Sequence, residues 1–419
     1  MTEGTAILPC PCEDRTIIAF VSQEEYEEIV AHPQKFRAWV DRDYRLNAEN
    51  YPEIFERGYK LHDKSTSAKL GILTRRITLR NKQHWTIHPS FVMPHMTGYT
   101  AEIAKALYLR KYGVSYEGLT YVFGRDENYW YRIEMRFGRK NIVATTVKTV
   151  EVPENLLADE HHSWVQGEKV AIATTIAEGV VLGAEISPGF SKDELEKAYG
   201  VFKDEVLIVE PEYAPKTVNT DGWGGTIGAW SALFPTIVLI RCFLHAWLRI
   251  RERSKKLESF FELGKMVWNV YYAETRRALG QRIRRLREWA TKNLNGVVQE
   301  KTLDLCDKQT EWNLWYEEGC EHAHTTSNML DRLMRSQNRY FERGQHFHGT
   351  LESANLRSRA WAILHNYWDW GRKTIKDNNG CRCPAERLNG KRYADCWLEN
   401  LLVATSNVKN GKSTPQKTA

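Results

Sequence analysis

The chain has 419 residues, of which 42% are hydrophobic and 27% charged, and its 59 basic and 53 acidic residues give a net charge of +6. This length supports roughly two or three domains with hydrophobic cores of their own. No apolar run approaches the roughly 20 residues that a membrane span needs, and no signal-peptide pattern opens the chain. The eight cysteines are scattered, which indicates reduced thiols rather than a disulfide framework. Together these features predict a cytoplasmic protein without membrane contact.

Residues 1–90 are predicted to contain a strand at 16–22, a helical stretch and a β-hairpin at 70–87. The hairpin carries three basic side chains, Arg75, Arg76 and Arg80. These could contact a phosphate backbone, and a solvated strand face explains them equally well. Cys10 and Cys12 alone are weak evidence for zinc.

Residues 91–145 are predicted to form three short helices, capped by Thr100, Ser115 and Asp126. The last helix combines Trp130 with basic side chains. A glycine turn followed by a basic, aromatic helix is typical of helix-turn-helix DNA-binding domains, and a plain helical bundle is the alternative. The residues predicted to contact DNA here are Arg132, Arg136, Arg139 and Lys140.

Between residues 150 and 245 the pattern changes to alternating strands and helices. The apolar residues 156–158 place Asp159 at the end of a short strand, and the chain then turns at 166–167 into a hairpin partner. Asp221 likewise follows a short β-rich run and precedes a glycine-led turn. Both carboxylates are therefore expected at strand ends.

Residues 246–323 have continuous helical periodicity, with predicted breaks near Gly280 and Gly296, and are best explained as an all-helical insertion. Several of its basic side chains are predicted to follow a DNA backbone. They are Arg282, Arg284, Arg285 and Arg287.

After the insertion, residues 324–372 are predicted to contain a helix that begins at Asn328 and carries Asp331, followed by a tryptophan-rich helix. Residues 373–419 form a C-terminal region that is expected to be disordered from about Thr405. Three thiols in it, those of Cys381, Cys383 and Cys396, lack an obvious fourth zinc ligand.

The three acids that stand out by context are Asp159, Asp221 and Asp331. Two Mg²⁺ ions held by carboxylates can stabilise the attacking and leaving oxygens of a phosphodiester displacement. The acids are far apart in sequence, so only a fold can bring them together.

In this combination the chain resembles the DDE/D transposases of insertion sequences. The matching segments are Leu-Ala-Asp-Glu at 157–160, Val-Asn-Thr-Asp-Gly-Trp at 218–223, Cys-x-x-His at 242–245 and Thr-Ser-Asn-Met-Leu-Asp-Arg at 326–332. Cys242 and His245 resemble the C(2)H motif of the Mutator-like and hAT-like groups, which carry a helical insertion before the third acid.

The resemblance implies an α/β fold with an RNase H-like mixed sheet, interrupted by the insertion and preceded by the helix-turn-helix. By implication Asp159, Asp221 and Asp331 hold two Mg²⁺, or Mn²⁺, for DNA cleavage at element ends and strand transfer. The implied partners are double-stranded DNA and further copies of the chain, in a dimer or larger assembly on the nucleoid.

Some positions leave alternatives open. Many relatives carry Glu where this chain has Asp331, so Glu342 and Glu352 are alternative third ligands. Cys242 and His245 are expected to pack and hydrogen-bond rather than bind metal, and the histidines at 322, 324, 346 and 348 are expected to be polar loop residues. A transposase-derived DNA-binding protein without catalysis and an RNase H-like nuclease are the alternative functions.

Overall fold

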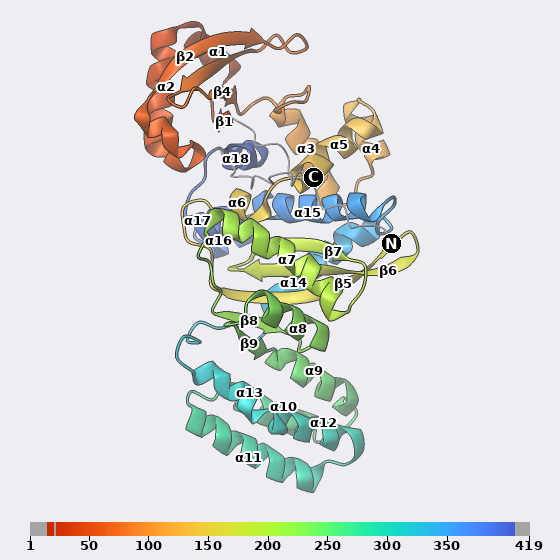
Figure 1. The fold of residues 1–419 in the computed structure, drawn as a ribbon. Coiled ribbons are helices and arrows are strands. Elements are labelled where there is room, and N and C mark those ends of the chain that lie inside the picture. Colours follow the sequence, from red (N-terminus) through yellow and green to blue (C-terminus); the bar gives the residue numbers. More distant parts are fainter. Residues whose placement is uncertain (1–14, 21, 407–419) are drawn as a thin grey trace, which may run out of the picture.

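The computed structural model describes residues 15–20 and 22–406 and contains two β-sheets surrounded by helices (Figure 1). The N-terminal sheet has the order β1-β4-β3-β2, with β1 parallel to β4 and the other pairs antiparallel. Its strands are β1 (Arg15–Ile18), β2 (Tyr59–Thr66), β3 (Leu73–Leu79) and β4 (His84–Pro89). Before β2 come α1 (Gln23–Ala31), α2 (Pro33–Leu46) and the 3-10 turns η1 (Ala48–Asn50) and η2 (Glu53–Arg57).

The pair β3 and β4 forms the hairpin that the sequence predicts, whereas β2 was not predicted because it is polar and mostly exposed. The hairpin arginines are engaged within this part of the chain. Arg75 is buried and donates to the Val30 carbonyl at 3.0 Å, Arg76 pairs with Asp63, and Arg80 donates to a backbone carbonyl.

Four helices follow the N-terminal sheet: α3 (Thr100–Lys111), α4 (Tyr116–Phe123), α5 (Glu127–Gly138) and α6 (Ile142–Thr146). Ser115 and Asp126 cap α4 and α5 as predicted, while the cap position of α3 is Tyr99 rather than Thr100. One face of α5 packs against α15 (Leu351–Tyr367). A Cβ atom at Gly138 would lie 2.0 Å from the Leu356 carbonyl oxygen, so only glycine permits this approach.

The second sheet has the order β7-β6-β5-β8-β9 and mixes antiparallel and parallel strands. Adjacent pairs among β5 (Asn155–Val165), β6 (Glu168–Ala177) and β7 (Val180–Ser187) are antiparallel, and β8 (Thr217–Thr220) and β9 (Val238–Arg241) add parallel neighbours beside β5. Helices α7 (Lys192–Val209) and α8 (Gly224–Leu233) cover one face, and α14 (Asn328–Arg343) and α15 cover the other. The chain therefore has an α/β fold with mixed sheets.

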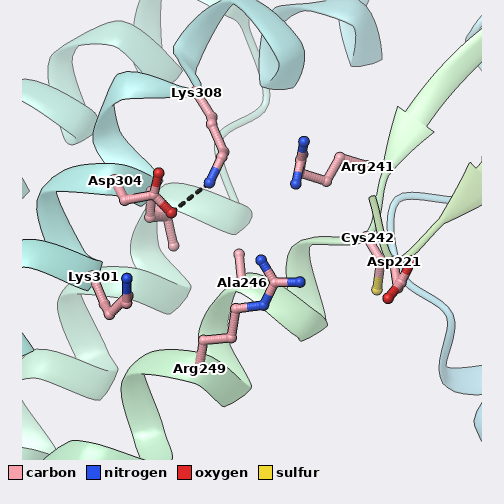
Figure 2. A pocket seen from close by; sticks show the side chains of 9 residues that line it. Asp221, Arg241, Cys242, Ala246, Arg249, Lys301, Asp304 and Lys308 are labelled. Carbon is pink, nitrogen blue, oxygen red and sulfur yellow. Dashed lines mark hydrogen bonds and ion pairs between the residues drawn. The ribbon is translucent and has the colours of Figure 1, made fainter. Parts of the chain in front are cut away.

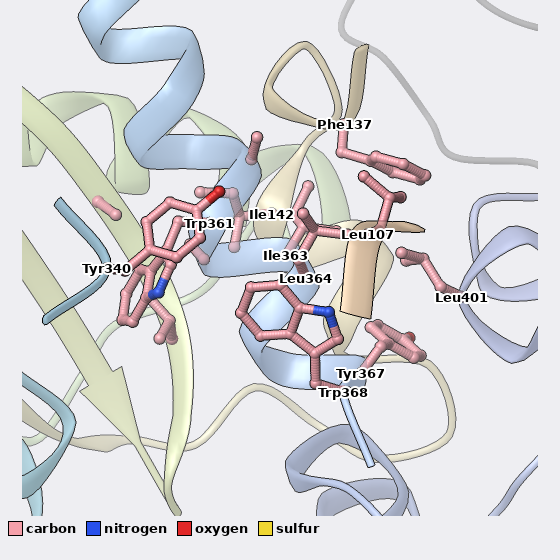
Figure 3. Close-up of a cluster of buried hydrophobic side chains, with 14 of the residues drawn as sticks. Leu107, Phe137, Ile142, Tyr340, Trp361, Ile363, Leu364, Tyr367, Trp368 and Leu401 are labelled. Atoms are coloured by element: carbon pink, nitrogen blue, oxygen red, sulfur yellow. The ribbon is translucent and has the colours of Figure 1, made fainter. Parts of the chain in front are cut away.

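Helix α15 lies at the centre of the largest hydrophobic core (Figure 3). It is buried around most of its circumference and contacts α5, α6, β7, α17 (Pro384–Asn389) and α18 (Trp397–Ala404). Its single buried guanidinium, that of Arg359, forms ion pairs with Glu185 and Glu205 and donates to two backbone carbonyls. A buried charge is tolerated only when it is paired and hydrogen-bonded in this way.

Between β9 and α14 the chain forms a helical unit with its own core around Phe243, Trp247 and Trp312. Its elements are α9 (Phe243–Ser254), α10 (Phe260–Tyr271), α11 (Arg276–Asn293), α12 (Gly296–Asp307), α13 (Gln309–Asn313) and η3 (Leu314–Tyr316). A helix does end before Gly296, but the predicted break near Gly280 is wrong. Gly280 lies inside α11, where its cost of about 1 kcal/mol relative to Ala is offset by packing of Leu279 and Ile283.

The C-terminal elements are α16 (Arg372–Asp377), α17 (Pro384–Asn389) and α18 (Trp397–Ala404), and α18 packs on α3, α15 and β1. The first two residues of the predicted disordered tail, Thr405 and Ser406, are buried, and Ser406 Oγ accepts the Ile17 N–H at 2.8 Å. The rest of the predicted tail, Cys10 and Cys12 lie outside the described residues. Within the described ranges no helix has both the length and the apolar character that crossing a bilayer requires.

Candidate metal centre

Asp159 lies in the middle of β5 rather than at its end, which corrects the sequence prediction. The antiparallel strand β6 pairs with β5 as far as Val165, and this pairing extends β5 beyond Asp159. The parallel strand β8 pairs with β5 only as far as Leu157. Asp159 therefore lies just beyond the end of the parallel ladder. Side chains alternate along a strand, so Asp159 shares the α14 and α15 face with Leu157, and Glu160 points to the opposite face.

The first turns of α9 and α14 bring two more functional side chains to this position. Helix α9 begins directly after β9, and its Phe243 N–H donates to the Thr325 carbonyl at 3.0 Å, just before α14 begins. His245 lies in the first turn of α9 and Asp331 in the first turn of α14. The chain therefore enters the helical unit after β9 and leaves it before α14 at neighbouring positions.

Asp159, His245 and Asp331 each offer a ligand atom, and these atoms lie within 4.8 Å of one another. The three side chains are half-buried, and no other such group of His, Cys, Asp or Glu is found among the described residues. The sequence favoured a packing role for His245, and nothing in its spacing from the acids indicated this convergence. Glu342 and Glu352, the alternative ligands, are exposed and lie outside the group.

Asp221 lies outside this three-residue group, in the loop between β8 and α8. Its carboxylate accepts the Trp223 N–H at 2.7 Å, a short-range bond typical of an Asx turn. Leu157 and Asn219 are the last pair of the β5–β8 ladder, so Asp159 and Asp221 each lie two residues beyond it, and the charge of Asp221 contributes to raising the pKa of Asp159. The two acids therefore share one electrostatic environment.

Acidic groups outnumber cations around Asp159. Burial, followed by the charges of Asp221 and Glu160, raises the pKa of Asp159 to about 7. The pKa of His245 is raised to about 9 by its hydrogen bond with Cys242, supported by the charges of Cys242, Asp159 and Asp331. A cation is favoured at such a position because it would relieve repulsion between the carboxylates.

Ser327 connects the two helix starts. Cys242 Sγ accepts the Ser327 N–H at 3.2 Å and lies at the same distance from its hydroxyl. Ser327 Oγ also contacts Asp331 Oδ2 at 3.2 Å and His245 Nδ1 at 3.5 Å. Burial acts to raise the pKa of the Cys242 thiol, but its hydrogen bonds with His245 and Ser327 outweigh burial and lower it. Cys242 and Ser327 thus connect the starts of α9 and α14 beside the candidate centre.

On the opposite face of β5, Glu160 is held by Tyr199 and Thr226, each of which donates to Oε1 at 2.7 Å. Tyr199 lies on α7 and Thr226 on α8. These bonds join both helices to the strand beside Asp159. Burial raises the pKa of Glu160 despite them.

The predicted DNA-binding residues near α5 differ in exposure. Arg132 and Arg139 are exposed, Arg136 is half-buried and Lys140 is buried beyond the end of the helix. Only the first two therefore present their side chains fully at the surface.

The basic residues of α11 are exposed or half-buried and partly engaged. Arg282 donates to the Asn269 carbonyl at 2.6 Å, Arg284 lies 3.8 Å from Glu288, and Arg287 pairs with Asp307 at 2.7 Å. Arg285 is exposed. In Figure 1, α11 forms the edge of the helical unit farthest from the sheets.

The remaining candidate metal ligands do not gather into a site. Cys381, Cys383 and Cys396 form no shared ligand group within the part of the chain that the structure describes, and burial raises the pKa of Cys383 to about 12. His346 Nδ1 contacts Ser163 Oγ at 3.2 Å, and His348 Nε2 lies 3.1 Å from the Gly344 carbonyl.

Comparison of the chain with protein-family models and with curated protein sequences finds no match.

Proposed function

We propose that this protein is a metal-dependent DNA transposase of the DDE/D type, which cuts DNA at element ends and joins the freed 3′-hydroxyl to target DNA. The observation that carries the proposal is the convergence of Asp159, His245 and Asp331 within 4.8 Å, with Asp221 electrostatically coupled to Asp159. These residues come from segments that the sequence resemblance singles out independently.

The strand arrangement supports an RNase H-like catalytic core. Three antiparallel strands are followed by two parallel ones, and the first acid lies on the central strand β5 where β8 ceases to pair with it. A helical unit separates β9 from the helix that carries the third acid. This order of elements is the one that the resemblance implies for transposases with a helical insertion.

The donor set fits a divalent cation, because carboxylate oxygens are the ligands that Mg²⁺ and Mn²⁺ prefer, and a neutral imidazole nitrogen is a ligand for transition metals such as Mn²⁺ rather than for Mg²⁺. Asp159, His245 and Asp331 would hold one ion, and Asp159 with Asp221 would hold a second. When bound, such ions activate water and stabilise negative charge at a phosphodiester.

The chain's own residues supply the positioning. Ser327 and Cys242 orient Asp331 and His245, and Glu160 fixes the strand next to Asp159. The exposed Arg132 and Arg139 of the helix-turn-helix candidate are the proposed contacts to double-stranded DNA. Joining two ends in one event requires a dimer or larger assembly.

The geometry equally suits an RNase H-like nuclease, which would cut without strand transfer. The test is to incubate the protein with Mg²⁺ or Mn²⁺ and a supercoiled plasmid that carries candidate end repeats. Joined products support the transposase and nicks alone support the nuclease. DNA binding without cleavage supports a domesticated DNA-binding protein. Asp159→Asn should abolish both cutting and joining, and products that persist in this variant would refute the proposed site.

A further inference from the structure

A shallow cleft between the strand ends and the helical unit is lined mainly by charged side chains (Figure 2). It is bounded by the ends of β8 and β9, by α9 and by α12, and the space between their side chains, open solvent included, is about 300 Å³. The charged residues around it are Asp221, Arg241, Arg249, Lys301, Asp304 and Lys308.

The cations of this cleft are only partly neutralised. Arg241 pairs with Glu311 and Lys308 with Asp304, while Lys301 pairs at 2.8 Å with its exposed neighbour Glu300. An exposed pair of this kind contributes little and releases its lysine easily. Arg249 is exposed and forms no ion pair with any residue in the described ranges. Arg249 and Lys301 are thus available to an anionic ligand.

The cleft borders the candidate metal centre through Cys242, which lines the cleft and contacts Ser327, and through Asp221; Gly222 follows Asp221 in the chain. Gly222 has φ +88°, and a Cβ atom there would lie 2.4 Å from Arg241 Nη1. Glycine therefore lets the Arg241 guanidinium lie against the backbone of the loop that carries Asp221. A DNA strand whose backbone passes Asp221 would place its phosphates next to Arg241 first, and then next to Arg249 and Lys301.

The cleft and the basic face of α11 are distinct surfaces. Arg249 lies on α9, which follows directly from the sheet, whereas α11 lies at the far edge of the helical unit (Figure 1). The sequence predicts DNA contacts on α11, and the position of the cleft favours α9 and α12 instead. Two sets of basic residues can therefore be compared within one structural unit.

We propose that this cleft binds the sugar-phosphate backbone of a DNA strand beside the cleavage site, with Arg249 and Lys301 as the principal phosphate contacts. The inference rests on the proposed function, because it places the strand next to Asp221. Most of the residues that line the cleft are charged and can contact a backbone phosphate, whereas an inserted base needs an apolar or stacking pocket.

The test compares the double variant Arg249→Ala/Lys301→Ala with Arg284→Ala/Arg285→Ala, which removes the same charge from α11. Affinity of the full-length protein for a fluorescently labelled duplex of mixed sequence is measured by anisotropy across a salt series. Loss of two phosphate contacts should weaken binding and reduce the slope of log affinity against log salt by about 2. The α11 variant should keep the wild-type slope, and Arg249→Lys/Lys301→Arg should keep most of the affinity.

An unchanged slope in the cleft variant, or a loss confined to the α11 variant, overturns the inference. The proposed function has a separate readout, because plasmid cleavage that depends on Asp159 can persist when the cleft variant binds normally. Failure of the wild-type protein to bind duplex DNA at low salt would overturn both.

Discussion

Ser327 is the residue on which the geometry of the candidate centre most depends. It is buried, and its backbone N–H and its hydroxyl contact Cys242, His245 and Asp331. Cys242 and His245 lie at the start of α9, the first helix of the helical unit, and Asp331 lies at the start of α14, which follows the unit. A group that hydrogen-bonds a metal ligand fixes the orientation of that ligand before the ion arrives. Ser327 is therefore a positioning residue for the two ligands that α9 and α14 contribute.

Ser327→Ala should weaken Mn²⁺ binding by roughly 10-fold to 100-fold, the usual effect of losing a hydrogen bond to a metal ligand. Ser327→Thr keeps the hydroxyl and should restore most of the affinity. Isothermal titration of both variants with Mn²⁺ measures this, with thermal melting as the check on folding. An alanine variant that binds Mn²⁺ like the wild type would show that Ser327 has only a packing role.

Elements with strong local signals could be predicted from the sequence. Helix α7 begins at Ser191 with a capping box to Glu194, and its apolar residues face the sheet as their spacing predicts. The break predicted at Gly280 failed because packing of neighbouring side chains overrides a weak local preference. The extension of β5 beyond Asp159 was missed for a similar reason, since pairing with β6 maintains a strand through polar residues.

Helix α5 approaches the backbone of α15 closely at Gly138, so this position should not tolerate alanine. Alanine favours a helix by about 1 kcal/mol over glycine, but its Cβ would lie 2.0 Å from the Leu356 carbonyl oxygen. We expect Gly138→Ala to lower the free energy of unfolding by about 1–3 kcal/mol, as overpacking usually does.

Gly200→Ala is the matched control, because Gly200 also lies inside a helix, α7, and the nearest atom to its Cβ position is Leu233 Cδ2 at 3.7 Å, an ordinary contact. It should leave stability unchanged or raise it by up to about 1 kcal/mol, because alanine is the better helix former. Urea denaturation of the two variants and the wild type measures the difference. Equal stability of the two variants would contradict the close packing of α5 on α15.

Helix α15 also carries a histidine that makes stability depend on pH. Burial of His365, followed by the charge of Lys111, lowers its pKa to about 4, and its ring lies 4.9 Å from that of Trp361. Because the unfolded chain binds a proton near pH 6.5 and the folded chain does not until about pH 4, stability is full above pH 6.5 and falls as the pH drops toward 4.

We expect this histidine alone to lower the free energy of unfolding by about 1 kcal/mol per pH unit between pH 6 and pH 5. His365→Gln cannot take up the proton, so its stability should vary less steeply over the same range. Urea unfolding of both proteins at several pH values gives the two slopes, and identical slopes would show that the ring is protonated in the folded state.

At the scale of the whole molecule, buried charge networks join parts of the chain that are distant in sequence. Glu134 of α5 accepts hydrogen bonds from Arg110 of α3 at 2.8 Å, from Tyr116 at 3.0 Å and from Tyr340 of α14. The three-helix segment upstream of the sheet is thereby tied to the helix that carries Asp331. A buried network of this kind is costly to break because each remaining partner keeps its desolvation cost.

The acids of the candidate site could be predicted from the sequence by their context and their resemblance, but their arrangement could not. His245 belongs to the ligand group because α9 starts directly after β9, which places His245 in the first turn of α9. Asp221 lies outside the group, in a loop where its carboxylate accepts the N–H of Trp223. Both features depend on how far strands and helices extend at one edge of the sheet. Local sequence patterns do not specify those lengths.

The measurement that tests the central claim most directly is a Mn²⁺ titration of Asp331→Asn beside Glu342→Gln. Both changes remove one carboxylate from α14, but only Asp331 lies in the three-residue group. The account predicts that Asp331→Asn loses at least about 10-fold in Mn²⁺ affinity while Glu342→Gln binds like the wild type. Equal affinities for the two variants, or a loss only with Glu342→Gln, would contradict it.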